Sequence, residues 1–259
     1  MTNIKRQKPG FILKKIKEQR VEKIKENIIN WIKQQVVQAK ARGVVLGLSG
    51  GVDSAVCAAL VKDVCEKNHQ ALILPCESIE NDIKDAKLVA DVLKLNMQLM
   101  DLTAVYTKLL EILPKGNLVA QGNLKARLRM TTLYYFANSR NFLVCGTGNR
   151  TELLLGYFTK YGDGGADILP IGDLFKHEVR QLAESVGIPK KIIKKRPSAG
   201  LWPGQTDEQE LGLSYRELDD ILSNLYHPKH ISKKFKKVKG LIDKSLHKRQ
   251  GAKIFYCKE

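Results

Sequence analysis

The feature that most constrains this fold is the alternation of short apolar runs with longer segments of helical periodicity. Four runs of four or five residues, the first of them partly β-branched, are typical of buried strands: 44–48, 71–75, 97–101 and 142–145. Apolar residues recur at helical spacing in the segments that follow each of the first three runs or precede the fourth: 53–67, 84–93, 103–113 and 118–139. Strands that alternate with helices of this length form βαβ units. The pattern therefore predicts an α/β fold, a doubly wound, mostly parallel sheet with helices on both faces.

Helical segments flank this core. Apolar residues at steps of three and four predict an amphipathic helix within the first forty residues: Val21, Ile24, Ile28, Ile32 and Val36. Beyond the core the pattern predicts loops at 161–167 and 196–210 and helices over 175–186, 214–225 and 231–246. No Ser/Gly-rich or Pro-rich linker divides the chain, so we expect a single domain over 1–259. Its parts are an N-terminal helical region (1–42), the α/β core (43–189) and C-terminal loops and helices (190–259).

The chain is strongly basic. Lys plus Arg number 44 against 27 Asp plus Glu, a formal charge of +17, and the surplus lies between Lys5 and Lys40 and between Lys229 and Arg249. Such a surface attracts nucleic acid, anionic lipid or phosphate-rich small molecules, and charge alone does not choose among them. No apolar run is long enough to cross a bilayer, and the lysine-rich N-terminus lacks a signal-peptide core. We therefore expect a cytoplasmic protein without a membrane partner.

The strongest local signal is an octapeptide at the junction of the first strand and the following helix. It reads Gly47-Leu48-Ser49-Gly50-Gly51-Val52-Asp53-Ser54. Glycines let the backbone turn tightly and expose successive N–H groups, the two serines add hydroxyl donors, and the helix directs its positive end at the turn. The string predicts a phosphate-binding cradle. It is not a P-loop, because no lysine ends it and it contains an acid. An acid beside a polyphosphate calls for a cation between them, so Asp53 is a candidate Mg²⁺ ligand.

The segment Ser49–Ser54 resembles the pyrophosphatase loop of the ATP-pyrophosphatase superfamily, whose members cleave ATP between the α- and β-phosphates and attach AMP to an acceptor. Five further segments resemble the NAD synthetase family, in that family's order. They are Asn123-Leu-Lys-Ala-Arg-Leu-Arg-Met130, Gly146-Thr-Gly-Asn-Arg-Thr-Glu152, Phe158-Thr-Lys-Tyr-Gly-Asp-Gly-Gly-Ala-Asp167, Glu210-Leu-Gly-Leu-Ser-Tyr215 and His247-Lys-Arg249. The resemblance covers most of the chain and implies the Rossmann-like fold of the adenine nucleotide alpha hydrolases.

The resemblance also implies roles for individual residues. ATP is expected to bind at Gly47–Ser54, Thr147, Lys176 and Ser198, and Mg²⁺ at Asp53 and Glu152. The residues expected to bind deamido-NAD are Arg127, Lys160, Asp167, His247 and Lys248. Two of these expectations have a physical reason as well. Thr147 follows the carboxyl end of the fourth strand, where ligands bind in open α/β sheets. Lys176 begins a helix, where a cation is unfavourable against the dipole and therefore needs an explanation.

The glycine-rich segment between Lys160 and Asp167 predicts a mobile loop. Gly162, Gly164 and Gly165 provide flexibility, and a loop that closes over an acyl-adenylate would protect this intermediate from water.

The reaction implied is ATP-dependent amidation of deamido-NAD by ammonia through an acyl-adenylate, which gives NAD, AMP and pyrophosphate. No residue is assigned as a general acid or base. Glutamine-using relatives carry an additional amidase domain, for which 259 residues leave no room, so ammonia is the expected donor. The resemblance also implies a homodimer with the dinucleotide site at its interface. One alternative is a tRNA-modifying ligase with the same loop, which the charge would suit, but no aromatic-studded basic module for reading RNA is present. A non-enzymatic nucleotide-binding module is the other, although it would be expected to have lost an acid or the cradle.

Overall fold

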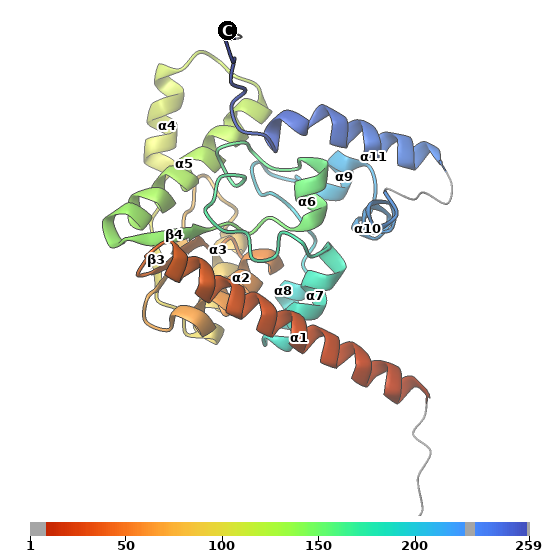
Figure 1. The fold of residues 1–259 in the computed structure, drawn as a ribbon. Coiled ribbons are helices and arrows are strands. Elements are labelled where there is room, and N and C mark those ends of the chain that lie inside the picture. Colours follow the sequence, from red (N-terminus) through yellow and green to blue (C-terminus); the bar gives the residue numbers. More distant parts are fainter. Residues whose placement is uncertain (1–8, 226–230, 258–259) are drawn as a thin grey trace, which may run out of the picture.

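A four-stranded parallel sheet organises the computed structural model, which describes residues 9–225 and 231–257 (Figure 1). The strands lie in the order β3-β2-β1-β4. Their bounds are Gly43–Gly47 for β1, His69–Ile73 for β2, Met97–Leu99 for β3 and Phe142–Cys145 for β4. All pairings are parallel, and Val45 of β1 is in register with Gln70 of β2 and Val144 of β4. The predicted parallel α/β sheet is confirmed.

Successive side chains of the strands enter two different cores. Val44 and Leu46 pack into the core on one face, whereas Val45, Leu72 and Val144 pack into the core on the other. This alternation is the period of two that a strand imposes on its side chains. Because both faces are buried, the strands read as continuous apolar runs in the sequence.

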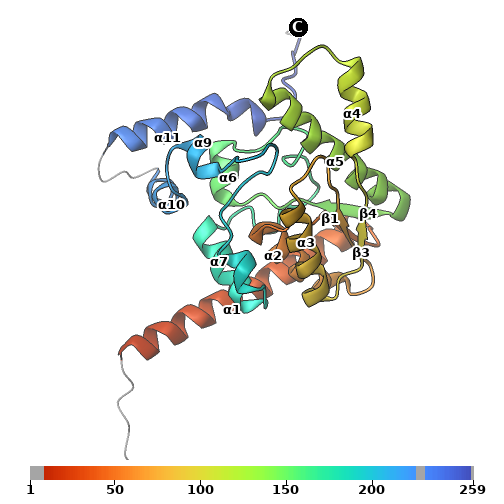
Figure 2. The same ribbon diagram turned by 180° about the vertical axis from the view of Figure 1, so that it is seen from behind.

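Helices cover both faces (Figures 1 and 2). On one face α2 and α3 contact the sheet, and α1 and α7 pack outside α2. On the other face α5 contacts β1 and β4, and α4 packs on α5. The bounds are Pro9–Gln38 for α1, Val52–Cys65 for α2, Glu80–Leu93 for α3, Thr103–Ile112 for α4, Leu118–Arg140 for α5 and Lys176–Ser185 for α7. The amphipathic N-terminal helix is confirmed: Ile32 is fully buried, and Val21, Ile28 and Val36 pack against the core.

The C-terminal part forms a third, smaller core. Its helices are α6 (Arg150–Leu155), α9 (Asp207–Leu211), α10 (Tyr215–Ser223) and α11 (Lys233–Lys244), followed by the 3₁₀-turn η1 (Leu246–Lys248). Leu155, Leu211, Leu218 and Val238 meet in this core. The short helix α8 (Lys190–Ile193) instead buries Ile192 and Ile193 in the first core, beside α7. In Figures 1 and 2, α11 lies along one side of α6, α9 and α10. The described helices include none that is long and apolar enough to cross a membrane.

Some boundaries differ from those predicted. Strand β2 begins at His69, two residues early, because His69 and Gln70 are buried polar residues that the apolar pattern does not reveal. Their side chains are satisfied: Nε2 of His69 accepts from the amide of Asn96 at 2.9 Å, and Arg140 donates to Gln70 at 2.6 Å. The prediction of a loop over 196–210 was wrong for its last four residues, because α9 begins at Asp207. Of the basic segments, Lys5 and Lys229 lie outside the described residues.

Candidate functional site

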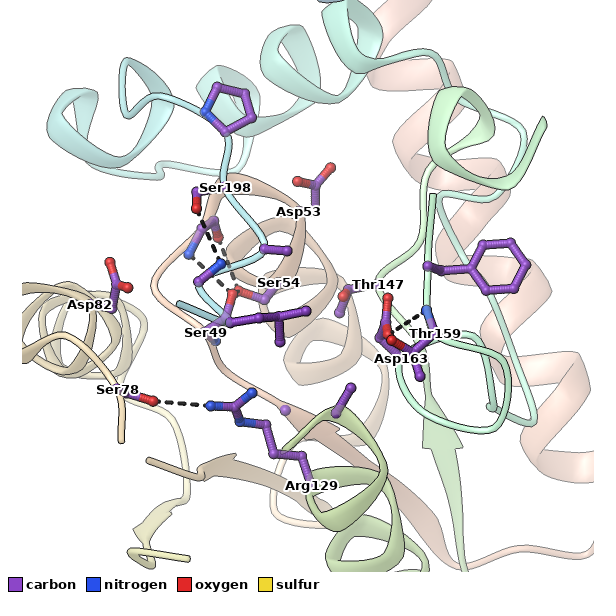
Figure 3. Close-up of a pocket in the computed structure, with 18 of the residues that line it drawn as sticks. Ser49, Asp53, Ser54, Ser78, Asp82, Arg129, Thr147, Thr159, Asp163 and Ser198 are labelled. Atoms are coloured by element: carbon purple, nitrogen blue, oxygen red, sulfur yellow. Dashed lines mark hydrogen bonds between the residues drawn. The ribbon is translucent and has the colours of Figure 1, made fainter. Parts of the chain in front are cut away.

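A cleft opens beyond the carboxyl end of β1 and receives most of the predicted ATP-binding residues. Of the octapeptide, every residue except Gly50 lines it. Thr147, Glu152, Lys176 and Ser198 line it as well, so segments more than 100 residues apart in the chain meet here. Figure 3 shows the cradle serines together with Ser198 on one side and Thr147 across the cleft. The position agrees with the rule that ligands of open α/β sheets bind beyond the carboxyl ends of the strands.

The cradle is held by its own hydroxyls (Figure 3). Ser54 Oγ accepts from the amide of Ser49 at 3.2 Å and lies 3.0 Å from the carbonyl oxygen of Gly51, to which it donates. The hydroxyls of Ser49 and Ser54 are 3.0 Å apart. Gly50 has φ +78°, and a Cβ there would lie 2.5 Å from the carbonyl oxygen of Asp82. Only glycine combines this left-handed conformation with such close approach to α3.

The two predicted metal ligands are joined by one buried lysine. Lys176 Nζ lies 2.5 Å from Asp53 Oδ2 and 3.2 Å from Glu152 Oε1, and its side chain is 3% exposed. The Tyr215 ring lies beneath the ammonium, 4.9 Å from Nζ to its centroid. These two carboxylates explain a cation at the start of α7, because they outweigh the unfavourable helix dipole.

Asn149 holds both carboxylates in position. Its side-chain oxygen caps α6 by accepting from the amide of Glu152 at 3.0 Å, and Glu152 completes a capping box. Its side-chain nitrogen donates to Asp53 Oδ1 at 3.0 Å. Asn149 is fully buried. One side chain therefore sets the spacing between an acid of α2 and an acid of α6.

Burial and charge shift the acid–base equilibria of this group. Burial raises the pKa of Glu152 to about 7; Lys176 opposes the rise and Asp53 adds to it. Burial alone would favour neutral Lys176, but Asp53 and Glu152 raise its pKa well above the ordinary value and keep the ammonium charged.

The described residues contain no cluster of three or more His, Cys, Asp or Glu side chains placed to hold a metal. Two carboxylates beside a phosphate cradle nevertheless fit Mg²⁺, which keeps several waters and commonly shares its sphere with phosphate oxygens. The ammonium of Lys176 shows that this position already accommodates a positive charge.

Two acids of the cleft were missed at the sequence level. Asp207 is buried and accepts hydrogen bonds from Tyr215 at 2.8 Å and Tyr157 at 3.2 Å. Burial raises its pKa. Glu210 accepts from Tyr157 at 2.5 Å. Both lie in the segment predicted as a loop, where their spacing of three in a short helix was the available signal.

Arg129 was missed too, although it stands two residues after the chosen Arg127. It projects from α5 below the cradle (Figure 3) and lines the cleft. Its Nε donates to the carbonyl oxygen of Leu74 at 2.9 Å and its Nη2 to Ser78 Oγ at 3.0 Å. Since both of these partners are neutral, the guanidinium brings a positive charge to the cleft that neither partner cancels.

Of the five residues predicted for deamido-NAD, Lys248 alone lines this cleft. Three others meet outside it: Arg127 Nε donates to the carbonyl oxygen of Lys160 at 3.3 Å, and Lys160 Nζ donates to that of His247 at 2.6 Å. Asp167 lies beside the carboxyl end of β4, where its carboxylate accepts hydrogen bonds from the amide of Val144 at 2.7 Å and from the hydroxyl of Tyr134 at 3.0 Å.

A second hollow adjoins these residues. It is lined by Met130, Thr131, Tyr134, Tyr135, Asn138, Tyr161 and Gly165. Two of its tyrosines, Tyr135 and Tyr161, are mostly exposed. The structure thus brings the predicted substrate residues beside a hollow with aromatic walls but assigns them no ligand.

The glycine-rich segment is closely packed. A Cβ on Gly164 would overlap the ring of Phe158, and one on Gly162 would lie 2.9 Å from Ala126 Cβ. Asp163 fastens the turn by accepting from the amide of Thr159 at 2.9 Å. The sequence-based reason for the glycines, flexibility alone, was therefore incomplete, because two of them are required by close contact. Mobility of the loop stays a prediction.

Comparison with known proteins gives consistent matches. The family model described as NAD synthase matches residues 24–252. The chain is 50% identical over 212 residues to the NH₃-dependent NAD⁺ synthetase of Archaeoglobus fulgidus, covering 80% of this chain and 86% of the relative.

Among solved structures, NMN synthetase from Francisella tularensis superposes with a TM-score of 0.84 at 39% identity, covering 90% of this chain and 98% of that chain. NH₃-dependent NAD synthetase from Campylobacter jejuni, in complex with nitrate, superposes with a TM-score of 0.80 at 31% identity, covering 91% and 99%.

Proposed function

The chain belongs to the NAD synthase family, as an ammonia-dependent ligase that converts deamido-NAD to NAD, and we propose how its cleft performs this reaction. The observation that carries the proposal is the placement of a Gly/Ser cradle beside two carboxylates that one buried lysine joins. A phosphate-binding turn alone would suit many nucleotide-binding proteins. The added carboxylates suit a reaction in which polyphosphate charge must be neutralised while a bond to phosphorus breaks.

ATP binds along the cleft with its phosphates in the cradle. The turn that contains Ser49, Gly51 and Ser54 lines the cleft at the N-terminus of α2, whose dipole favours anions. Thr147 and Ser198 lie on opposite sides of the cradle (Figure 3), where Thr147 brings a hydroxyl group and the Ser198 hydroxyl donates to the carbonyl oxygen of Gln205 at 2.7 Å. The guanidinium of Arg129, whose hydrogen-bond partners Leu74 and Ser78 are neutral, adds positive charge below it.

Asp53 and Glu152 would hold Mg²⁺ together with phosphate oxygens. The ion supplies charge neutralisation and template geometry for the polyphosphate. Asn149 fixes the separation of the two carboxylates before any ligand arrives. Lys176 neutralises them in the empty protein and is placed to contact phosphate oxygens when nucleotide is bound.

The chemistry follows from this positioning. A nicotinate carboxylate oxygen of deamido-NAD attacks the α-phosphorus, the bond to the β-phosphate bridging oxygen breaks, and pyrophosphate leaves into the cradle. Ammonia then attacks the acyl carbon, the bond to the AMP oxygen breaks, and a proton is lost from nitrogen. Positioning and electrostatics account for both steps without a covalent enzyme intermediate. We assign no protein residue as general base.

Deamido-NAD is proposed to reach the cleft across the second hollow. Arg127, Lys160 and His247 form a connected group beside it. Met130 lines both the hollow and the cleft, and Lys248 lines the cleft. Asp167 is held by Tyr134, which lines the hollow. Tyr135 and Tyr161, which line the hollow, are mostly exposed in the single chain. We propose that the chain, a single domain over 1–259, forms a homodimer in which the second copy completes this site.

The test is incubation of the purified chain with ATP, Mg²⁺, ammonium and deamido-NAD. We expect AMP, pyrophosphate and NAD in equal amounts, and no AMP when deamido-NAD is omitted. Because one structural relative is described as NMN synthetase, a parallel reaction contains nicotinate mononucleotide. Faster turnover of the mononucleotide than of deamido-NAD would show that the mononucleotide is the preferred substrate. AMP release that requires RNA instead of either acid would contradict the proposed function.

A further inference from the structure

The carbonyl group of Gly50 contacts a residue from a distant part of the chain. Gly50 is the one residue of the octapeptide that does not line the cleft, and it faces the first turns of α3 instead. Its carbonyl oxygen accepts a hydrogen bond from Lys195 Nζ at 3.3 Å. Lys195 follows α8 and comes from a segment 145 residues away in the chain. A distant cation that lines the same cleft therefore contacts the backbone of the phosphate cradle.

Lys195 is itself held by two acids of α3. Its Nζ lies 2.8 Å from Asp82 Oδ1 and 2.7 Å from Asp85 Oδ2. With the Gly50 carbonyl these make three acceptors, which match the three N–H donors of an ammonium. Asp85 is 4% exposed, so this arrangement is anchored in the protein interior. Since all three donors are used, Lys195 has none left over for a nucleotide.

The geometry of a peptide bond connects this contact to the cleft. In a planar trans peptide the carbonyl oxygen of one residue and the amide hydrogen of the next point in opposite directions. The Gly50 oxygen is directed toward Lys195, and the amide of Gly51 donates to Ser49 Oγ at 3.3 Å, a hydroxyl that lines the cleft. A peptide between two glycines rotates with little steric resistance, so its orientation needs an external restraint.

We propose that Lys195, fixed by Asp82 and Asp85, is a positioning residue that keeps the Gly51 amide on the side of the cradle where Ser49 Oγ lies and where the phosphates of ATP bind. The inference rests on the proposed function, in which this amide belongs to the phosphate cradle. Lys195 also precedes the segment that carries Ser198. The same contact therefore ties one wall of the cleft to the cradle.

The chain offers a matched control on the adjoining helix. Lys191 also pairs with Asp85, at 2.6 Å from Nζ to Oδ1, but its side chain is 68% exposed and it does not line the cleft. Lys195→Met and Lys191→Met each remove one lysine from the same carboxylate. Only the first removes the restraint on the Gly50 carbonyl.

The kinetic test compares these variants with the wild-type chain. We expect Lys195→Met to raise KM for ATP and to weaken inhibition by pyrophosphate, each about tenfold, because one oriented amide donor is lost. KM for deamido-NAD should change by less than about twofold, and Lys191→Met should resemble wild type in all three measurements. Equal KM values for ATP in Lys195→Met and Lys191→Met would overturn the proposal.

A spectroscopic test does not depend on activity. In protein labelled with ¹⁵N-glycine, the Gly51 amide resonance should shift in Lys195→Met and stay in place in Lys191→Met. Lys195→Arg, which keeps the charge and several donors, should restore part of the shift and part of the ATP affinity. An unmoved Gly51 resonance in Lys195→Met overturns the inference. If the wild-type chain forms no NAD, the proposed function is contradicted. The inference can still be tested in that case, by titrating pyrophosphate into wild type and Lys195→Met and following the Gly51 amide resonance.

Discussion

Lys176 shows how one residue can prepare a site for a charge that arrives later. Its ammonium lies between Asp53 and Glu152, two carboxylates that would repel each other if both were ionised and unpaired. Burial of such a group costs several kcal/mol per ion unless partners compensate it. With Lys176 in place, both acids can remain beside a phosphate cradle in the empty protein.

Lys176→Met should therefore destabilise the unliganded protein by about 3 kcal/mol, because it leaves buried carboxylates without their cation. Mg²⁺ with ATP should raise the Tm of this variant by more than that of wild type, since the added cation replaces the missing charge. Thermal unfolding with and without these ligands measures both effects. Lys108→Met, which breaks an exposed pair with Glu111, is the control and should change little. Equal stabilisation of variant and wild type by Mg²⁺ and ATP would argue against metal binding at these carboxylates.

At the scale of elements, the glycine-rich segment 161–167 is both the predicted lid and a packed turn. Gly164 lies against the ring of Phe158, whereas the nearest atom to a Cβ on Gly165 would be the carbonyl oxygen of Gly162 at 3.3 Å. Neither glycine has a positive φ in the range that favours glycine, so steric contact separates the two positions. A comparison of single substitutions can therefore distinguish packing from flexibility.

Gly164→Ala should lower the free energy of unfolding by about 2 kcal/mol, because its methyl group requires Phe158 to move. Gly165→Ala should have a much smaller effect. Denaturant unfolding measures the stabilities, and the ratio of NAD formed to AMP released measures how well the intermediate is protected. If flexibility alone were needed, both variants would uncouple this ratio to the same extent without a difference in stability.

At the scale of the whole molecule, the identity of the nitrogen donor can be tested with the purified chain alone. Ammonia is the nucleophile and ammonium is not, since protonation removes the lone pair of electrons. At constant total ammonium the rate should therefore rise with pH, and plots against the concentration of free NH₃ should overlay where the enzyme's own groups do not titrate. Glutamine should not replace ammonium. Efficient turnover of glutamine by the purified chain would contradict the assignment of ammonia as donor.

The homodimer is the second prediction at this scale. The exposed tyrosines of the second hollow, Tyr135 and Tyr161, leave the proposed dinucleotide site open in one chain. Light scattering at assay concentration should give about twice the 29.1 kDa of the chain. Because each copy carries +17, added salt should favour association by screening repulsion. A fully active species with the mass of one chain would refute the prediction.

The sequence by itself determined the parallel α/β sheet, the phosphate cradle and the family. Strands, helices and the Gly47–Ser54 turn are encoded locally, in periods of 2 and 3.6 residues and in glycines that permit a tight turn. The strands were readable because both faces of the sheet are apolar. The apolar pattern did not predict that strand β2 includes His69 and Gln70, because these two residues are polar and are buried through hydrogen bonds to Asn96 and Arg140.

Only the tertiary structure decided which side chains meet. Lys176 with Asp53, Lys195 with Gly50 and Arg129 with Leu74 are pairs separated by 123, 145 and 55 residues, and no local pattern specifies them. The same holds for Gly164, whose need for glycine comes from the ring of Phe158 and not from backbone conformation. Such contacts depend on how whole elements pack, because the energy of a buried charge or a close approach is set by neighbours that the fold alone brings together.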